Sequence, residues 1–314
     1  MTDAHPDLTC LHSAYLHSAA WAFGRKRTWT ASSPEAAERL AHERLEGYYE
    51  ADVPPWQLAA DSAAETLKRA GVEPTDLDLV IYASESTDSR VDLSRDPDRF
   101  AMAAGAETVP LLGATANVCA NFGAALRIAR NAIQVGDARR VLLVTTDVWD
   151  DRSRLVDAGT CLMSDAAASV LVTADRPDEG WLVGDIHSAT DHAMHDVDPA
   201  VDTIAMVRRT AGGMRRAAEG FFASHRLRRE DYPRIVVGNV GLTVLRVLAA
   251  AGGLDLGRMV TQTAQNGHCF AADVIVNLAE IEPEARHGDR VLALSTGHNY
   301  WTCVGLQRVA EQTR

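Results

Sequence analysis

The sequence is poor in cysteine, in aromatic residues and in positive charge, and none of its apolar runs is long. Five cysteines occur among 314 residues, and no two of them form a C-x-x-C pair. An odd number of scattered cysteines suits a reducing compartment better than a disulfide framework, which predicts a cytoplasmic protein. The first residues lack the basic start and apolar stretch of a secretory signal, which favours the same location.

The shortage of positive charge limits the partners of the protein. Lys and Arg number 31 against 43 Asp and Glu, and the formal net charge is -12. Proteins that bind nucleic-acid duplexes need surplus positive charge to displace counterions from phosphates, so this class is excluded. The longest apolar runs, such as Val141 to Val144, are far shorter than the roughly 20 residues of a membrane span. No nucleic-acid partner and no membrane partner are expected.

The sequence also lacks the motifs of common cofactor and metal sites. Neither a dinucleotide-binding nor a P-loop glycine motif occurs, so nucleotide chemistry has no support. His187, His192 and His195 lie at irregular spacing in an acidic stretch. This spacing does not match zinc ligands and favours a solvated loop, so no metal and no bound cofactor are expected.

What the sequence does contain is an alternation of strands and helices. Short apolar, β-branched runs predict buried strands, and longer segments with apolar residues at helical spacing predict helices. The first half has apolar runs at 77–83, 109–116, 141–146 and 168–174 and helices at 57–70 and 120–135. The second half repeats this order with strands at 234–238, 291–295 and 302–309 and helices at 240–251 and 271–280.

This repeat predicts the architecture. Helices alternating with buried strands predict an α/β fold with largely parallel sheets covered on both faces. The repeated order predicts two related halves, residues 1–175 and 176–314, about a pseudo-twofold axis. Cys119 precedes the long helix of the first half, and His268 precedes the equivalent helix of the second. Halves packed back to back bring these two helix starts together, which is the central structural expectation.

At these residues the chain resembles the thiolase superfamily, and specifically its β-ketoacyl-acyl-carrier-protein synthase III branch. The matching segments are Asn117 to Phe122 before a helix and Gly136, Ser164 to Ala168, Asn266-Gly267-His268 before Ala271-Ala272, and Ser295-Thr296-Gly297 near Trp301. Their order and spacing agree over nearly the whole length. The resemblance implies a five-layered αβαβα fold with two pseudo-symmetric halves, commonly a homodimer.

Departures from this branch carry most of the functional information. Members that catalyse decarboxylative Claisen condensation use a Cys, a His at the end of a second-half strand and an Asn in a later loop. Here the strand ends in Gly238 and Asn239, and the loop carries His268. Asn239 fills the place of the missing His only if the alignment shifts by one residue. In acyl-transferring members, a His in this loop and an Asp five positions later complete a triad, and His268 and Asp273 match that pattern.

Each of these residues also has a purely structural interpretation. Cys119 at a helix start is favoured as a thiolate by unpaired N–H groups and the helix dipole, or it is a small buried residue. Asp273, one turn after His268, orients the imidazole and stabilises its protonated form, or it is only a first-turn acid. Cys269 is interpreted as packing or pocket wall, with a second nucleophile as the alternative.

The resemblance further implies an oxyanion hole for the tetrahedral intermediate. Its donors would be the backbone N–H groups of Cys119 and Gly297. On sequence grounds alone, Gly297 is equally well explained as a turn glycine. His298 and Asn299 replace the small, glycine-rich stretch of condensing members, which predicts a pocket reshaped for an acceptor.

The acyl donor would be a thioester of coenzyme A or of acyl-carrier-protein phosphopantetheine. Two arginine pairs seven residues apart lie on nearby faces if their segment is helical, and they are candidates for docking an acidic carrier: Arg208, Arg209, Arg215 and Arg216. A solvated helix face is the alternative. The family's tryptophan and arginine elements for the adenine of coenzyme A are not recognisable between Thr28 and Trp56, which favours a carrier donor.

The sequence therefore predicts an acyltransferase of specialised-metabolite biosynthesis. Cys119 would form an acyl-enzyme, and His268, oriented by Asp273, would activate a hydroxyl or amine of a small-molecule acceptor. Two other classes of protein remain open. One is a decarboxylative Claisen condensing enzyme, and the other is a non-catalytic partner subunit of a synthase heterodimer.

Overall fold

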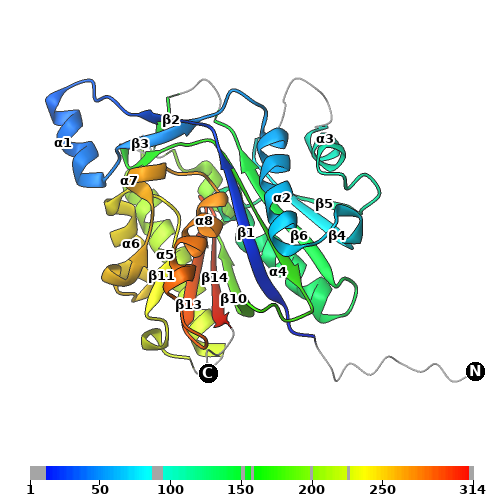
Figure 1. Cartoon of the computed structure of the whole chain (residues 1–314). Helices are drawn as coiled ribbons and strands as arrows, with labels where there is room; N and C mark the ends of the chain where they lie inside the picture. The colour runs from blue at the N-terminus through cyan, green and yellow to red at the C-terminus, as the bar shows by residue number, and fades with distance from the viewer. Residues whose placement is uncertain are drawn as a thin grey trace, which may run out of the picture.

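A ten-stranded sheet runs through the molecule in the order β12-β11-β13-β14-β10-β1-β9-β6-β4-β5 (Figure 1). The structure is a computed structural model that describes residues 12–86, 95–149, 153–156, 159–198, 201–224 and 227–310. Two small sheets lie outside the main one: β2 (Arg25–Thr28) with β3 (Gly47–Glu50), and β7 (Leu155–Val156) with β8 (Cys161–Leu162).

The strands of the main sheet divide equally between the two halves of the chain. The first half supplies β1 (Tyr15–Phe23), β4 (Leu79–Ala83), β5 (Leu111–Ala114), β6 (Arg140–Asp147) and β9 (Ala166–Thr173). The second half supplies β10 (Gly180–Thr190), β11 (Arg234–Val236), β12 (Met259–Val260), β13 (Arg290–Thr296) and β14 (Tyr300–Val309). The two sets have equivalent internal orders and join where β1 pairs with β10. The pseudo-symmetry expected from the repeat is confirmed.

Helices form three layers with the strands between them. On the outer faces lie α2 (Pro55–Ala70) with α3 (Asp96–Ala103), and α5 (Thr203–Ser224) with α6 (Leu242–Gly252). Between the two halves lie α4 (Asn121–Gln134) and α8 (Ala272–Ile281), each of which contacts strands of both halves. The remaining two are α1 (Pro34–Glu43) and the short α7 (Thr263–Asn266). The five-layered αβαβα fold is therefore confirmed.

Every strand and helix expected from the sequence is present with slightly shifted ends, but the expectation of largely parallel sheets is wrong. β4 pairs in parallel with β5 and β6, and β11 does so with β12 and β13. The other neighbours in the main sheet are antiparallel. The short connection between β13 and β14, residues 297–299, explains one of these pairings. A parallel pair would need a crossover of a dozen or more residues.

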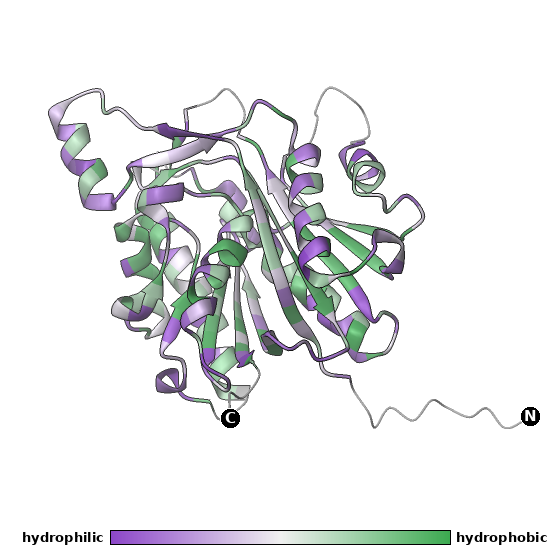
Figure 2. Ribbon diagram, viewed as in Figure 1, coloured by the Kyte–Doolittle hydropathy of each residue, from purple (hydrophilic) through white to green (hydrophobic). Residues whose placement is uncertain are grey.

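The centre of the molecule packs around α4 and α8. Figure 2 shows hydrophobic residues gathered on the strands of the main sheet and on the helices that cover them. Gly123, in the first turn of α4, permits a close approach to the second half. A Cβ at this position would lie 2.8 Å from the Cβ of Thr302 on β14. The start of α4 is thus held against the half that carries His268.

No helix in the described ranges is both long and apolar enough to cross a bilayer.

Candidate active site

The candidate nucleophile lies in a strained turn at the start of α4. Cys119 is the middle residue of a single 3-10 turn, Val118–Ala120, that runs directly into the helix. Val118 has a φ of 50°, in the left-handed region. This conformation is unusual for a β-branched residue and costs about 1–3 kcal/mol. The turn leaves Cys119 half-buried at the N-terminal end of α4.

His268 and Asp273 continue from Cys119 in one line of contacts. The Nε2 of His268 lies 3.0 Å from the Sγ of Cys119. The Nδ1 of the same ring makes a short hydrogen bond with the Oδ2 of Asp273. His268 is 5% exposed, and Asp273 is fully buried. The structure thus brings together the two helix starts that the repeat predicts to meet.

The backbone fixes His268 before α8 begins. Its N–H donates to the carbonyl of Leu162 at 2.7 Å, and its carbonyl accepts from the N–H of Ser164 at 2.9 Å. The ring of Phe270 stacks on the imidazole with 6.0 Å between centroids. The position of the imidazole therefore depends on pairing with the first-half segment 162–164, across the junction between the halves.

Asp273 holds the imidazole with a carboxylate that is fully occupied by donors. Besides His268, its Oδ2 accepts from the backbone N–H of Asn239 at 2.7 Å. Its Oδ1 accepts from the side-chain amide of Asn239 at 2.9 Å and from the N–H of Cys269 at 2.8 Å. A carboxylate has about four lone-pair sites, and all are used here. The carboxylate can neither rotate nor turn to solvent without losing buried hydrogen bonds.

The surroundings of His268 favour its protonated form. Burial alone would lower the pKa of His268, but Cys119, Cys161 and Asp273 outweigh burial and raise this pKa well above the ordinary value of 6.5. Because Nδ1 faces a carboxylate, Nδ1 carries a proton and Nε2 is the nitrogen that faces the sulfur. The ring can therefore accept the proton of the Cys119 thiol and remain as an imidazolium beside a thiolate.

The structure also explains what occupies the place of the missing histidine. A Cβ on Gly238 would lie 3.5 Å from the Oδ2 of Asp273 and 3.6 Å from the Cε1 of His268, so the pair lies directly beside this residue. Asn239, the alternative candidate for the place of the histidine, belongs to the hydrogen-bond network around Asp273. The Oδ1 of Asn239 accepts from the N–H of Gln262 at 2.7 Å and the amide of Asn277 at 2.9 Å, while its own amide binds Asp273. Asn239 supports the carboxylate and makes no contact with Cys119.

The two expected oxyanion donors differ in the structure. No hydrogen bond from the N–H of Cys119 is found among the described residues, so this donor is free for a ligand oxygen. The N–H of Gly297 instead donates to the carbonyl of Tyr300 at 2.8 Å, which closes the hairpin between β13 and β14. The turn interpretation of Gly297 describes this arrangement, and its N–H is not available as a second oxyanion donor here.

The remaining pocket candidates lie at different depths. Cys269 packs in the core with its Sγ 3.7 Å from the carbonyl of Asn266, and burial raises its pKa well above the ordinary value. Packing is therefore its role in the fold, and its thiol is not part of the cavity wall. His298 lines the cavity, and its Nε2 lies 3.1 Å from the carbonyl of Met194. Asn299 does not line the cavity, and its carbonyl accepts from the N–H of Asp191 at 2.9 Å.

Cys119 and His268 open onto a mostly apolar cavity of about 390 Å³. Two outer helices form one side, with Thr203, Met206, Val207 and Thr210 from α5 and Thr243, Val244, Val247 and Leu248 from α6. The rest of the lining comes from segments near the catalytic residues and includes Val118, Trp149, Cys161 on β8, Met163, Phe270 and Trp301 on β14. Sequence reasoning missed the α5 and α6 residues, because helical periodicity does not distinguish a face on an internal cavity from one on the core.

Glu85 is a further residue near the site that sequence reasoning missed. It follows β4, the neighbour of β5 in a parallel pair, and β5 leads toward the nucleophile turn. Carboxyl ends of parallel strands meet at one edge of a sheet, so this adjacency was a usable signal. The Oε1 of Glu85 accepts from the N–H of Val118 at 2.8 Å.

The four arginines considered for carrier docking lie on α5 as expected, but they separate into two pairs. Arg209 pairs with Asp191 at 2.9 Å, and Arg216 donates to the carbonyl of Thr190 at 3.2 Å, so both hold the end of β10. Arg208 and Arg215 are exposed. Because seven residues are about two helical turns, these two lie on one face of α5.

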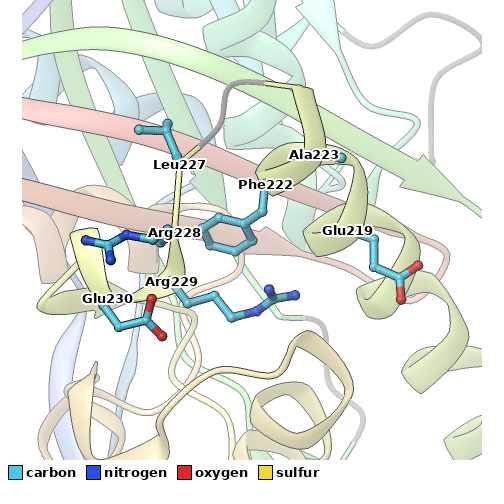
Figure 3. Close-up of a pocket in the computed structure, with 7 residues that line it drawn as sticks. All are labelled: Glu219, Phe222, Ala223, Leu227, Arg228, Arg229 and Glu230. Atoms are coloured by element: carbon cyan, nitrogen blue, oxygen red, sulfur yellow. The ribbon is translucent and has the colours of Figure 1, made fainter.

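A second cavity, of about 480 Å³, lies at the C-terminal end of α5 (Figure 3). Its lining contains none of the candidate catalytic residues. Four charged and three apolar residues line it: Glu219, Arg228, Arg229 and Glu230, with Phe222, Ala223 and Leu227. Across the part of the chain that the structure describes, no cluster of three or more His, Cys, Asp or Glu side chains is arranged to hold a metal ion.

Comparisons with known proteins agree with this fold. Residues 115–192, which contain the nucleophile turn, match the family model of 3-oxoacyl-[acyl-carrier-protein] synthase III. The chain is 26% identical over 261 residues to a β-ketoacyl-[acyl-carrier-protein] synthase III of Rhodobacter capsulatus. This alignment covers 77% of this chain and 80% of that protein.

Solved structures show the same fold at lower sequence identity. ChlB3, described as an acyltransferase, superposes with a TM-score of 0.82 at 18% identity, covering 95% of this chain and 98% of that one. The synthase III of Pseudomonas aeruginosa superposes with a TM-score of 0.80 at 18% identity, covering 96% and 100%. The fold is thiolase-like, as in these solved structures. In sequence, the chain is similar to β-ketoacyl-acyl-carrier-protein synthase III, a family of transferases.

Proposed function

We propose that this protein transfers an acyl group from a thioester to a hydroxyl or amine of a small-molecule acceptor, in specialised-metabolite biosynthesis. The observation that carries the proposal is the line of contacts from the Sγ of Cys119 through His268 to Asp273. A base in contact with the nucleophile and oriented by a buried carboxylate suits proton transfer to and from oxygen or nitrogen.

The first half-reaction acylates Cys119. His268 takes the thiol proton, and the thiolate attacks the thioester carbonyl carbon to form a tetrahedral intermediate. The N–H of Cys119 is placed to donate to the resulting oxyanion. The bond to the donor sulfur then breaks, and the imidazolium returns its proton to the departing thiolate. The products are an acyl-enzyme and the free thiol of the donor.

The second half-reaction transfers the acyl group to the acceptor. The Nε2 of His268 removes the proton of the acceptor hydroxyl or amine as it attacks the acyl carbon. The bond to Cys119 breaks, and the imidazolium protonates the leaving thiolate. Asp273 keeps the proton on Nδ1 and stabilises the imidazolium in both halves. The donor thiol leaves before the acceptor reacts with the acyl-enzyme, so ping-pong turnover is expected.

The side chains around the thiol support transfer over decarboxylative condensation. Loss of carbon dioxide leaves an enolate, whose thioester oxygen needs two aimed donors. His268 can supply one, but Gly238 has no side chain and Asn239 is directed to Asp273. The contact between Cys119 and His268 also supports a catalytic protein over an inactive partner subunit.

We further propose a carrier-protein donor that docks beside the mouth of the cavity. Arg208 is exposed and follows Val207, which lines the cavity, and Arg215 lies on the same exposed face. Neither arginine has an ion-pair partner among the described residues, and two cations beside a cavity complement the acidic surface of a carrier protein. A homodimer is also proposed, supported by the exposed Leu112 on the edge strand β5. The free thiols of the described cysteines support a cytoplasmic location.

Intact-protein mass spectrometry tests the proposed reaction. Protein is incubated with acyl-coenzyme A and acyl-carrier-protein donors, and the expected result is one added acyl group on the wild type and none on Cys119→Ala. Addition of a nucleophilic acceptor should then remove the group. Acylation of Cys119→Ala would exclude the assignment. Carbon dioxide release from a malonyl donor would instead identify condensation, and a wild type that no donor acylates would support the partner-subunit alternative.

A further inference from the structure

Glu85 makes a direct connection between the end of β4 and the turn that carries Cys119. Its Oε1 accepts two hydrogen bonds, from the N–H of Val118 at 2.8 Å and from the side-chain amide of Asn121 at 2.8 Å. The Oδ1 of Asn121 in turn accepts from the N–H of Asn117 at 3.1 Å. Residues on both sides of Cys119 are therefore fixed by one carboxylate.

Glu85 is itself held in place at its backbone. Its N–H donates to the Oδ1 of Asp147, at the end of β6, at 2.7 Å. The same carboxyl oxygen accepts from the N–H of Ser86 at 3.0 Å. Since β4 and β6 are adjacent parallel strands, the backbone of Glu85 is anchored to the sheet. Its side chain therefore extends from a fixed point to the nucleophile turn.

The nucleophile turn needs such an anchor, because Val118 is in the left-handed region at a φ of 50°. A strained conformation persists only when its surroundings determine it. The hydrogen bond to Glu85 engages the N–H of Val118, while the next N–H in the chain, that of Cys119, has no partner among the described residues. Loss of the anchor would let the turn relax and move both this N–H and the Sγ of Cys119.

We propose that Glu85 is a positioning residue for catalysis, which fixes the Sγ of Cys119 against His268 and aims the N–H of Cys119 at the acyl oxygen. It acts through Val118 and Asn121 and exchanges no proton with substrate. This inference rests on the proposed function of the site. Both bonds end on one oxygen, so an amide carbonyl in its place can accept both.

That property gives a matched pair of variants. Glu85→Ala removes both bonds, and the acylation rate constant of Cys119 should fall about 10²-fold, the usual result of a misplacement of about 1 Å. Glu85→Gln keeps an acceptor and should stay within about threefold of the wild type, because the geometry is preserved. The Glu282→Ala variant, which loses an ion pair with Arg308 remote from the site, controls for stability: its melting temperature should fall while acylation is unchanged.

A second readout keeps this test separate from the proposed reaction. The rate of Cys119 alkylation by iodoacetamide, located by peptide mass mapping, reports the contact with His268 without an acyl donor. Glu85→Ala should slow it about tenfold, because a weakened ion pair leaves less thiolate. If no donor acylates the wild type but alkylation still falls in Glu85→Ala and not in Glu85→Gln, the proposed function fails and the positioning role stands.

Asn121→Ala removes the hydrogen bond between Asn121 and Glu85 and the bond from the N–H of Asn117. This variant tests the proposal if Glu85→Ala does not fold. It should lower both rates, and combining it with Glu85→Ala should give less than the product of the single effects, because the two residues act as one unit. Wild-type rates in both alanine variants would overturn the proposal. So would a Glu85→Gln variant as slow as Glu85→Ala, since charge and not position would then be responsible.

Discussion

Replacement of Asp273 by Asn changes a single atom of a buried network, and the structure determines how the network must respond. Each oxygen of the carboxylate accepts from two donors. The amide nitrogen of Asn must therefore face one of these donor pairs. At the Oδ1 position it would oppose the N–H of Cys269, which cannot accept, and the amide of Asn239, which could flip only by losing its bonds from Gln262 and Asn277. At the Oδ2 position it would oppose the N–H of Asn239 and the Nδ1 of His268.

The second orientation is the less costly one, because imidazole can change its tautomer. With the amide nitrogen facing it, Nδ1 becomes an acceptor, and only the N–H of Asn239 is left without a partner. One buried unsatisfied donor costs about 1–3 kcal/mol, compared with about 2–6 kcal/mol for two in the other orientation. The variant should fold, with its free energy of unfolding reduced by about 1–3 kcal/mol.

The tautomer that relieves the network disables the base. The proton now sits on Nε2, which faces the Sγ of Cys119 and can no longer accept from it. The equivalent change in the serine-protease triad lowers kcat about 10⁴-fold, and a similar loss is expected in both half-reactions here. Single-turnover acylation and transfer to the acceptor, followed by mass spectrometry well below the melting temperature, measure each half.

Asn277→Ala is the matched control for lost stability. Asn277 donates to the carbonyl of Val237 at 2.8 Å and to the Oδ1 of Asn239 at 2.9 Å, so its loss weakens the same network without contact to His268. It should be destabilised by a comparable amount, about 1–3 kcal/mol, and still be acylated at close to the wild-type rate. An Asp273→Asn variant that keeps rates within about tenfold of the wild type would refute the tautomer argument.

Two other perturbations test separate parts of the molecule. Burial raises the pKa of Asp147 to about 7 from an ordinary value near 3.8, so the stability linked to its protonation is present below about pH 4 and lost as pH rises through 7. Asp147→Asn should therefore become increasingly more stable than the wild type between pH 5 and pH 8, by at most about 4 kcal/mol in the free energy of unfolding. The measurement is the melting temperature of both proteins across this range, and a pH-independent difference would contradict the prediction. Arg208→Glu with Arg215→Glu should raise KM for a carrier-linked donor by about tenfold or more and leave KM for acyl-coenzyme A unchanged. The control Arg139→Glu lies at the opposite end of β6 from the site, and an equal effect there would mean that overall charge, not docking, is responsible.

The elements that position the site were predictable because their signals are local. Buried, β-branched runs such as 141–146 specify strands wherever they occur, and the repeated order of elements specifies that the starts of α4 and α8 are equivalent places. Cys119 and His268 follow from that equivalence. The antiparallel neighbours were not predicted, because strand direction depends on connection length and not on composition.

Hydrogen bonding within the site was much less predictable. Whether the N–H of Gly297 faces a ligand or closes a hairpin depends on the register of β13 against β14, which sequence alone does not reveal. Similarly, Arg209 and Arg216 have the same sequence pattern as Arg208 and Arg215, but only the first two meet the end of β10. Glu85 was overlooked because its partners lie 33 and 36 residues further along the chain.

The departure from the condensing pattern couples residue 268 to its neighbours at the strand end. A Cβ on Gly238 would contact the Oδ2 of Asp273 at 3.5 Å and the Cε1 of His268 at 3.6 Å, and the side chain of Asn239 binds the same carboxylate. Restoring the condensing arrangement would require both a histidine at the strand end and the loss of the imidazole at 268. With the imidazole gone, Asp273 would lose one of its four donors and the cation that it stabilises, while remaining buried. A buried carboxylate without its cation is costly, so the loop histidine and its carboxylate are expected to be retained or replaced together.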